Sequence, residues 1–395
     1  MTPDVVQFGA GAIGRGFLAH LWHKAGLSTG FVEASQELVQ AINDKTAYPL
    51  RLVDGTIVHE LTIDRVQAVP VTDAESVCQW LAGCRFAATA VGVHAFESLA
   101  PIIAGEIAER AHQIPPETWQ EKPFNMICCE NQKDAGALLR KAVQASLDSS
   151  EVVADYFNSW CGFVDASVGR MVPPQTERLH AEHPLLLVAE PYAELPVDAV
   201  AWKGKHPEVP GVHLRENFAG YVARKLYTHN GGHALLAYLG YRQGHSSIHQ
   251  CADDPQLVLE LQRYWRETGA ALIVAYGFDE ATQRSHEADL LQRFRNPALG
   301  DTVARVARDP ARKLRKEDRL VGAALLCLEN GFDPQPAAHA VAAALHYDFP
   351  EDPAALAVQE SIQKRGVADA FSELSSLSKD HPLVTLVESA YNSLR

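Results

Sequence analysis

The chain lacks the features that mark a nucleic-acid-binding or membrane protein. Its 35 lysines and arginines are outnumbered by 49 aspartates and glutamates, and the net charge of −14 argues against bulk nucleic-acid binding. No apolar run approaches the length of a membrane span, and no basic region precedes an apolar signal core at the N-terminus. We therefore expect a cytoplasmic protein with neither a membrane nor a nucleic-acid partner.

The seven cysteines are also too few and too scattered for a metal or disulfide framework. Apart from Cys128-Cys129 they stand alone, and no C-x-x-C pair occurs. We expect no bound metal and a reducing compartment. Internal repeats and low-complexity tracts are absent as well, and 395 residues with 47% hydrophobic content suit about two globular domains.

A glycine-rich segment at the start of the chain is the most informative motif. Gly9, Gly11 and Gly14 form G-x-G-x-x-G between residues 5–8, an apolar stretch typical of a buried strand, and residues 17–22, which have helical spacing. In dinucleotide-binding folds these glycines permit a tight turn, backbone approach to a pyrophosphate and close helix packing. The helix N-terminus then attracts the phosphates. A bare motif of this kind also fits an ordinary tight turn.

An acid lies where the ribose of such a nucleotide is recognised. A second apolar stretch, 29–32, ends in Glu33, about twenty residues beyond the glycines. A carboxylate there would bind the ribose hydroxyls and repel a 2′-phosphate, which favours NAD over NADP. The residues expected to hold the cofactor are Phe8, Gly9, Ala10, Gly11, Ala12, Ile13, Gly14, Glu33, Ala90, Val91, Gly92 and Asn131.

Strands and helices are expected to alternate through the first half. The predicted strands are Val5–Phe8, Thr29–Val32, Leu50–Val53, Phe86–Val91, Phe124–Cys129 and Leu185–Val188. The alternation predicts an α/β fold: a Rossmann-type, doubly wound, mostly parallel sheet with helices on both faces. Residues 50–53 and 60–63 look more like a small inserted hairpin. Ligands of such sheets gather at the carboxyl ends of the strands.

The composition changes from about Ala193. Pro196, Pro207 and Pro210 suggest a crossover or linker, and the pattern beyond residue 218 is almost wholly helical. The predicted helices are Tyr221–Leu239, Pro255–Tyr276, Asp279–Arg293, Arg319–Asn330, Ala337–His346, Pro353–Gly366 and His381–Ser393. We expect a dinucleotide-binding domain at 1–210 and an all-α-helical substrate domain at 211–395, with the active site between them.

One helical segment carries side chains suited to chemistry on an alcohol. On an α-helix Lys225, Asn230 and His233 lie within an arc of roughly 140°, so all three would face one cleft. The adjacent Gly231 and Gly232 cost on the order of 2 kcal/mol in a helix interior. Either the helix breaks there or a ligand approaches its backbone. Spacing alone fits a solvated lysine beside an Asn-Gly-Gly turn equally well.

These motifs make the chain resemble the polyol-specific long-chain dehydrogenases. The resemblance rests on the segment 8–17 and on the Lys225-x4-Asn230-x2-His233 pattern. It continues through Cys129-Glu130-Asn131, Gly162–Asp165, Val172–Pro174, Arg224–Leu226, Tyr276–Asp279, Arg293–Pro297 and Arg312–Leu314. It covers nearly the full length, in order and at compatible spacing. It implies a metal-free NAD enzyme that interconverts a polyol and a ketose.

Roles for the catalytic candidates follow from alcohol oxidation. Lys225 is the candidate general base, because burial and a positive nicotinamide would lower its pKa. Asn230 and Asn131 would donate N–H groups to the developing alkoxide. His233 would hydrogen-bond a substrate hydroxyl. Glu130 would either pass the proton to water or pair with a cation such as Lys225.

A basic segment favours a phosphorylated substrate. Residues 305–319 hold seven basic and three acidic side chains, a local charge of +4 in a chain of −14. Arg308 and Arg312 could grip a phosphate bidentately, and the resemblance implies that Arg305 and Lys313 are substrate-site positions. We expect oxidation of mannitol 1-phosphate to fructose 6-phosphate by a monomer or weak homo-oligomer.

One departure from the family pattern keeps alternatives open. The family usually reads Val-Asp-Arg where this chain reads Val168-Gly169-Arg170, so a carboxylate that helps to hold substrate is missing. The alternatives are a dehydrogenase of an unphosphorylated polyol or sugar acid, of the mannitol 2-dehydrogenase or tagaturonate/fructuronate reductase type, and a catalytically impaired NAD-binding protein. The Asn230-Gly-Gly-His233 segment makes a 6-phosphogluconate type of dehydrogenase less suitable.

Overall fold

The computed structural model describes residues 2–173, 175 and 177–394. It divides into two compact units, Met1–Phe218 and Ala219–Arg395. The sequence predicts a domain boundary at residue 210, and the observed division lies eight residues later, after Phe218. The reason is a pair of parallel strands near the end of the first unit, in which β11 (Val212–Arg215) pairs with β10 (Leu195–Asp198). The proline-rich stretch expected to be a linker is therefore part of the first unit.

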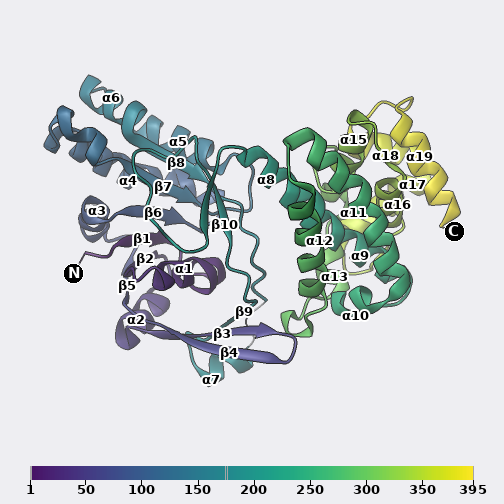
Figure 1. Ribbon diagram of the computed structural model, residues 1–395, viewed down its shortest axis with the longest axis horizontal. Helices are drawn as coiled ribbons and strands as arrows, with labels where there is room; N and C mark the ends of the chain where they lie inside the picture. The colour runs from purple at the N-terminus through teal and green to yellow at the C-terminus, as the bar shows by residue number, and fades with distance from the viewer. Residues whose placement is uncertain (1, 174, 176, 395) are drawn as a thin grey trace. The chain divides into compact units, whose positions relative to one another are not determined.

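Six parallel strands form the main sheet of the first unit, in the order β5-β2-β1-β6-β7-β8 (Figure 1). The strands are β1 (Val5–Phe8), β2 (Thr29–Glu33), β5 (Val66–Pro70), β6 (Phe86–Thr89), β7 (Phe124–Cys128) and β8 (Cys161–Asp165). The order runs outwards from β1 in both directions, with its switch point between β1 and β6, as in doubly wound nucleotide-binding sheets. The predicted fold class is confirmed.

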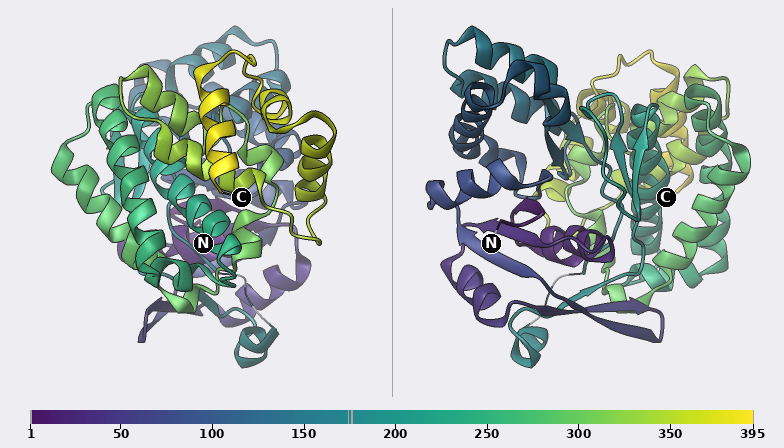
Figure 2. Two further views of the ribbon diagram at one scale, coloured as in Figure 1. Left: turned by 90° about the vertical axis from the view of Figure 1, so that its right-hand side faces the viewer. Right: turned by 60° about the vertical axis from the view of Figure 1, so that its left-hand side comes forward.

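A second, three-stranded sheet corrects part of the strand prediction. The sequence reasoning missed β5 and β8 and wrongly assigned residues 185–188 to the main sheet. Strand β9 (Leu187–Ala189) pairs instead with β3 (Tyr48–Asp54), which forms an antiparallel hairpin with β4 (Ile57–Ile63). Figures 1 and 2 show this hairpin as two long arrows apart from the main sheet. A short apolar run signals burial but does not identify the strand it pairs with.

Helices cover both faces of the main sheet. They are α1 (Ala19–Lys24), α2 (Gln36–Lys45), α3 (Ala74–Gly83), α4 (Phe96–Gln113), α5 (Ala135–Ser146) and α6 (Glu151–Trp160), with shorter turns at Gly14–Leu18, Val93–Ala95 and Pro116–Glu121. A further helix, α7 (Glu177–Glu182), lies beside the β3–β4 hairpin (Figure 1), where Glu182 pairs with Arg51. Successive residues of a strand face opposite sides. Val5 accordingly shares one core with Trp22 of α1, and Val6 shares the other with Leu81 of α3 and Ile103 of α4.

Among the described residues of the second unit, the regular secondary structure is helical, apart from an isolated bridge between Ser247 and Thr302. Its elements are α8 (Phe218–Arg224), a π-helical turn (Lys225–Asn230), α9 (Gly231–Arg242), α10 (Ile248–Asp253), α11 (Pro255–Tyr276), α12 (Glu280–Phe294), a short turn (Pro297–Leu299), α13 (Val303–Ala307), α14 (Pro310–Lys313), α15 (Val321–Glu329), α16 (Gln335–Leu345), α17 (Pro353–Arg365), α18 (Val367–Ser375) and α19 (Pro382–Ser393). The all-α prediction for this half is confirmed.

The longest helix shows why these sequence segments begin and end where they do. Helix α11 starts at Pro255 directly after Asp254, whose carboxylate accepts the N–H groups of Gln256 and Leu257. It stops at Gly277, which adopts a left-handed conformation with φ 67°. Within the described part of the chain, no helix is both long and apolar enough to cross a bilayer.

Candidate active site

The glycine turn lies at the carboxyl end of β1, between the ends of β2 and β6. Gly9 donates its N–H to the carbonyl of Val32, and Ala90 donates to the carbonyl of Phe8, both at 2.9 Å from N to O. Gly9 has φ 89°, and a Cβ there would lie 2.5 Å from the carbonyl oxygen of Ala90. A Cβ on Gly14 would collide with the carbonyl of Gly9. Only glycine therefore fits at these two positions.

The middle glycine of the motif faces open space. Nothing lies within 4 Å of a Cβ built on Gly11. Ala12 and Ile13 follow it at the start of the helix, and the N–H of Arg15 bonds back to the Gly11 carbonyl at 3.0 Å. An open backbone at a helix start is what a phosphate group requires. The turn fits the pyrophosphate of a dinucleotide.

The carboxylate of Glu33 is fixed against this turn. Its Oε2 accepts the N–H of Ala10 at 2.7 Å, and its Oε1 accepts those of Ala34 and Ser35 at 2.8 and 3.0 Å. Glu33 ends β2 and is half-buried. An oriented carboxylate at the end of the second strand, beside the glycine turn, matches the ribose position of NAD-binding sheets.

A second carboxylate fixes the turn that follows β6. Glu130, 7% exposed, accepts the N–H of Val91 through Oε1 at 3.1 Å and that of Gly92 through Oε2 at 2.8 Å. Gly92 has φ 82°, which suits glycine. These amide contacts differ from both sequence hypotheses for Glu130, the proton relay and the pair with a cation. Asn131, the next residue, is exposed.

Two buried arginines that the sequence reasoning missed hold these segments in place. Arg15 donates from Nε to the carbonyl of Ala10 at 2.6 Å and from Nη1 to that of Leu185 at 2.9 Å. Arg170 donates from Nε to the carbonyl of Tyr192 at 2.5 Å. In the sequence, these two arginines are marked only by their position in motifs of the family resemblance: Arg15 in the segment 8–17 and Arg170 in Val168-Gly169-Arg170. Guanidinium groups that bond main-chain carbonyls satisfy buried acceptors and stiffen the loops that carry them.

Tyr192 accounts for the glycine at position 169. A Cβ built on Gly169 would lie 3.1 Å from Cε1 of the Tyr192 ring and 3.5 Å from its hydroxyl. The carboxylate that the family pattern places here would press against that ring. The Tyr192 ring therefore lies beside the main chain at position 169, where the family resemblance implied a carboxylate.

In the second unit, Lys225 begins the π-helical turn between α8 and α9. Burial lowers the pKa of Lys225 to about 8, and the positive charge of Arg319 contributes less. A lysine with this pKa is partly neutral in mildly alkaline solution and can accept a proton. Asn230 ends the turn and is half-buried.

Gly231 and Gly232 have a packing explanation. The helix does not break at them: they open α9, directly after the π-helical turn. A Cβ on Gly231 would collide with the hydroxyl of Tyr264, and one on Gly232 would lie 2.8 Å from Nε1 of Trp265. Both rings come from α11 and donate hydrogen bonds to carbonyls of the π-helical turn. The expectation of a broken helix or a closely bound ligand is wrong, because α11 itself occupies this space.

His233 lies two residues further along α9. Its ring stacks on Phe294 with centroids 4.8 Å apart, and its Nε2 lies 3.3 Å from Oδ2 of Asp301. Asp301 is also ion-paired with Arg305. Burial, followed by the charge of Arg305, lowers the pKa of His233 to about 3. The imidazole is therefore neutral and can act as a hydrogen-bonding group.

The basic segment 305–319 is largely paired within itself. Arg312 pairs with Asp309 at 3.2 Å and with Asp318 at 3.0 Å. Lys313 is 4% exposed and donates to the carbonyl of Arg308. Burial lowers the pKa of Lys313 to about 7, and neighbouring arginines add to the effect. Lys313 is thus a buried lysine that loses its proton more readily than an exposed one. Arg308, by contrast, is exposed.

The predicted site residues are thus distributed over both units. Glu33, Glu130 and Asn131 belong to the first, and Lys225 and His233 belong to the second. All seven cysteines are free thiols. Among the residues that the structure describes, no three histidine, cysteine or acidic side chains are grouped so as to hold a metal ion.

Two family models together cover nearly the whole chain. Residues 3–211 match the mannitol dehydrogenase Rossmann domain, and residues 217–395 match the mannitol dehydrogenase C-terminal domain.

Individual relatives are similar over the same length. A mannitol-1-phosphate 5-dehydrogenase of Brevibacillus brevis is 36% identical over 390 residues, which cover 99% of this chain and 98% of the relative. One from Geobacillus stearothermophilus is 34% identical over 392 residues and 99% of each chain. The ternary complex of Pseudomonas fluorescens mannitol 2-dehydrogenase with NAD and D-mannitol has the same fold, with a TM-score of 0.71, 21% identity, and 99% of this chain and 92% of that one covered.

Proposed function

The chain belongs to the mannitol dehydrogenase family, whose two domain models it matches in order, and we propose that it interconverts D-mannitol 1-phosphate and D-fructose 6-phosphate. It is an NAD-dependent oxidoreductase. The observation that carries the choice of substrate is the similarity, over 99% of the chain, to two proteins named mannitol-1-phosphate 5-dehydrogenase. Lys225, which is half-buried and has a lowered pKa, supports the chemistry.

The first unit supplies the cofactor residues in this proposal. NAD, when bound, accepts a hydride from the alcohol carbon. The open backbone at Gly11 would hold its pyrophosphate, and Glu33 would accept hydrogen bonds from its ribose hydroxyls. The amide contacts of Glu130 support a bracing role at the turn after β6 in place of a proton relay.

The second unit supplies the base. Lys225 would remove the hydroxyl proton of the polyol and return it when the ketose is reduced. Asn230, with Asn131 of the first unit, would donate N–H groups to the alkoxide, and the neutral His233 would bond a neighbouring hydroxyl. Because these donors stabilise the developing negative charge, the reaction as proposed needs no metal.

The phosphate group would be bound by the basic segment. Lys313 is the central residue of the proposed phosphate site. Burial lowers its pKa, and a bound phosphate dianion would raise that pKa again and so keep the lysine charged. Arg305, Arg308 and Arg312 complete the proposed set. Arg312 is already paired with two carboxylates, which leaves its guanidinium less available to bind a phosphate group. This observation favours the alternative substrate, a free polyol or sugar acid.

The free thiols support a reducing, cytoplasmic location, and we propose a monomer or weak homo-oligomer without nucleic-acid partners.

The substrate is tested by NADH oxidation with four ketoses at equal concentration: fructose 6-phosphate, fructose, tagaturonate and fructuronate. We expect the highest kcat/KM for fructose 6-phosphate, by at least about 100-fold over fructose, which corresponds to about 2.7 kcal/mol of binding to the phosphate. A higher kcat/KM for either sugar acid would assign the enzyme to that substrate instead. NADH binding without turnover of any of the four would indicate a protein that has lost catalysis.

A further inference from the structure

The π-helical turn at Lys225–Asn230 changes the main-chain hydrogen bonding of its helix. In an α-helix the N–H of Gly231 would bond to the carbonyl of Tyr227, four residues back. Here that N–H bonds to the carbonyls of Leu226 and Thr228 and passes over the carbonyl of Tyr227 between them. The π winding therefore leaves one main-chain acceptor that needs another donor.

A tyrosine of α11 supplies that donor. The hydroxyl of Tyr264 donates to the carbonyl of Tyr227 at 2.8 Å, and the carbonyl of Arg319 lies farther away, at 3.3 Å. Tyr264 is fully buried. Because buried carbonyls in folded proteins are nearly always paired, the phenol takes the place of the main-chain N–H that the π winding removes.

Glycine at position 231 makes this hydrogen bond possible. A Cβ there would collide with the Tyr264 hydroxyl and would lie 3.1 Å from the carbonyl oxygen of Arg319. A side chain at position 231 would thus push the phenol away from the turn. The first glycine of the Asn-Gly-Gly-His segment therefore provides the opening through which the hydroxyl reaches the Tyr227 carbonyl.

The next residue of α11 contacts the next carbonyl of the turn. Nε1 of Trp265 donates to the carbonyl of Thr228 at 2.9 Å. The Thr228 carbonyl also accepts the N–H of Gly231, so it has a main-chain donor besides the indole. Of the two rings, the phenol of Tyr264 therefore matters more for the winding of the turn.

The winding of the turn affects the direction of its first residue, Lys225. If the N–H of Gly231 bonded to Tyr227, this turn would be wound as an α-helix. Lys225 would then point in a different direction relative to His233, which lies on α9 beyond the turn. A hydrogen bond that blocks this rewinding keeps the two side chains in their present relation.

We propose that Tyr264 is a positioning residue, whose hydroxyl binds the carbonyl of Tyr227 and so holds the π winding that directs the amino group of Lys225. The inference rests on the proposed function only in taking Lys225 as the base. The environment of the Lys225 amino group can be measured without any substrate, so the two proposals can be tested separately.

The first test compares the turnover of Tyr264→Phe with that of the natural enzyme. The substitution keeps the ring and removes the hydroxyl, so the Tyr227 carbonyl can regain a main-chain donor only if the turn rewinds. We expect kcat to fall about 10- to 100-fold, as is typical when a reacting group is misplaced. NADH affinity should stay within about twofold, because the predicted cofactor residues lie in the first unit.

The second test measures the titration of Lys225 directly. Trace acetylation with acetic anhydride at a series of pH values, followed by peptide mass spectrometry, compares Lys225 with the exposed Lys364 of the same protein. Burial lowers the pKa of Lys225 to about 8. A lysine that turns out of its place regains solvent, so its labelling midpoint in Tyr264→Phe should rise by at least about one pH unit.

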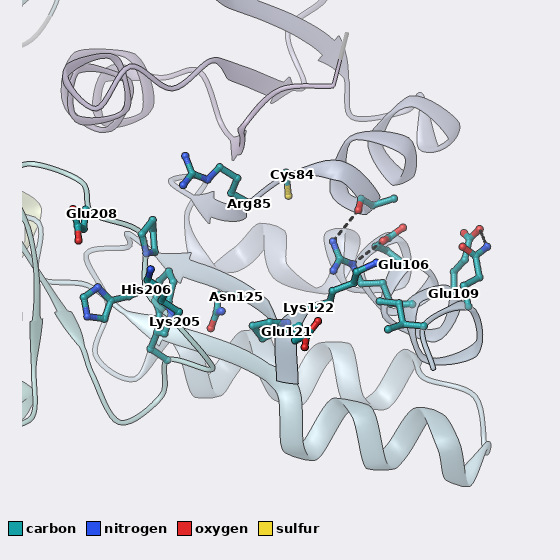
Figure 3. A pocket seen from close by; sticks show the side chains of 17 residues that line it. Cys84, Arg85, Glu106, Glu109, Glu121, Lys122, Asn125, Lys205, His206 and Glu208 are labelled. Carbon is teal, nitrogen blue, oxygen red and sulfur yellow. Dashed lines mark hydrogen bonds and ion pairs between the residues drawn. The ribbon is translucent and has the colours of Figure 1, made fainter. Parts of the chain in front are cut away.

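Tyr156→Phe is the matched control. Tyr156 of the first unit is also fully buried, and its hydroxyl donates to the carbonyl of Lys122 at 2.7 Å. Lys122 lines a hollow of about 760 Å³ (Figure 3), and none of the described residues around that hollow is a predicted site residue. Both variants should lower Tm to a similar degree, but only Tyr264→Phe should change kcat and the labelling of Lys225.

Trp265→Phe completes the series and should move the labelling midpoint less than Tyr264→Phe, because the Thr228 carbonyl keeps its main-chain donor. A larger shift in Trp265→Phe would assign the role to the indole and refute it for the phenol. An unchanged midpoint in Tyr264→Phe, or the same shift in Tyr156→Phe, would also refute the positioning role. A shifted midpoint with unchanged kcat would support that role but remove Lys225 as the base.

Discussion

His233 and Asp301 lie in contact, with Nε2 of the histidine 3.3 Å from Oδ2 of the aspartate, yet the histidine is not the charged partner of that carboxylate. Asp301 pairs with Arg305, four residues further along the chain. Burial and the surrounding cations lower the pKa of His233 to about 3. The ring, stacked on Phe294, is therefore a fixed neutral group beside an internal ion pair.

This neutrality predicts how His233 responds to substitution. His233→Ala should lower kcat/KM at least about tenfold, whereas His233→Gln should recover part of the loss, because an amide replaces the hydrogen bonds of a neutral ring. The pH profile of the natural enzyme should show no step near pH 6.5 that the substitution removes. Equal losses in the two variants, together with such a step, would mean that the histidine acts as a charged acid.

Lys225 should determine the alkaline side of the pH profile. Its pKa of about 8 predicts that kcat/KM for polyol oxidation rises with pH through about 8 and then levels off, while ketose reduction declines above the same pH. Lys225→Ala should lower kcat by on the order of 10²–10⁴ and leave NADH affinity within about twofold. Lys364→Ala, an exposed lysine of the same unit outside the basic segment, is the control. An active Lys225→Ala enzyme would overturn the assignment of the base.

Lys313 should make recognition of the phosphate depend on pH. Its pKa of about 7 means that it loses its proton as pH rises, so KM for mannitol 1-phosphate should increase above about pH 7. The range to measure starts at about pH 6.5, where the phosphate is already mostly dianionic. Lys313→Met should raise this KM about tenfold and abolish its pH dependence, with little effect on free mannitol. A parallel effect on both substrates would point to a structural role.

Glu33 should determine the choice between NAD and NADP. Glu33→Ala removes the ribose acceptor and also leaves the N–H of Ala10 without its carboxylate partner. We expect KM for NAD to rise about tenfold, which equals about 1.4 kcal/mol, and KM for NADP to change less, because the repulsion of its phosphate is gone. Glu37→Ala, an exposed acid of α2, is the control. A natural enzyme that already prefers NADP would contradict this role.

Gly169 and Tyr192 should be coupled in stability. Gly169→Asp brings a side chain against the ring 3.1 Å away, and overpacking of this kind costs about 1–3 kcal/mol. We expect a lower Tm for Gly169→Asp and partial recovery when Tyr192→Ala is added, measured as a double-mutant cycle. Strictly additive effects would show that the two positions do not share this space.

The fold could be predicted from the sequence where periodicity and turn residues agree. Helix α11 has the predicted bounds, because Asp254, Pro255 and Gly277 mark its two ends. The glycine turn was recognisable from its strand–turn–helix context. Strands β5 and β8 were missed, because each is a short apolar segment whose place depends on pairing with a distant strand.

The candidate site was less accessible from the sequence, since its contacts join distant segments. Nothing in the local sequence shows that Glu130 binds the amides of Val91 and Gly92, almost forty residues away. The arc calculated for Lys225 and His233 assumed a regular α-helix, and the π-helical turn changes the angles between them. Composition indicated a positive patch at 305–319, but only the structure shows which of its charges are internally neutralised.

The π-helical turn at Lys225–Asn230 also bears on how this helix tolerates change in length. A π turn holds more residues per turn than an α-helix, so the helix from Phe218 to Arg242 carries the equivalent of a one-residue insertion. Deleting one residue from the turn would restore regular winding and rotate α8 by about 100° relative to α9. The direction of the Lys225 side chain thus depends on the number of residues in the turn. We expect a single deletion here to abolish the proposed activity although every helix is retained.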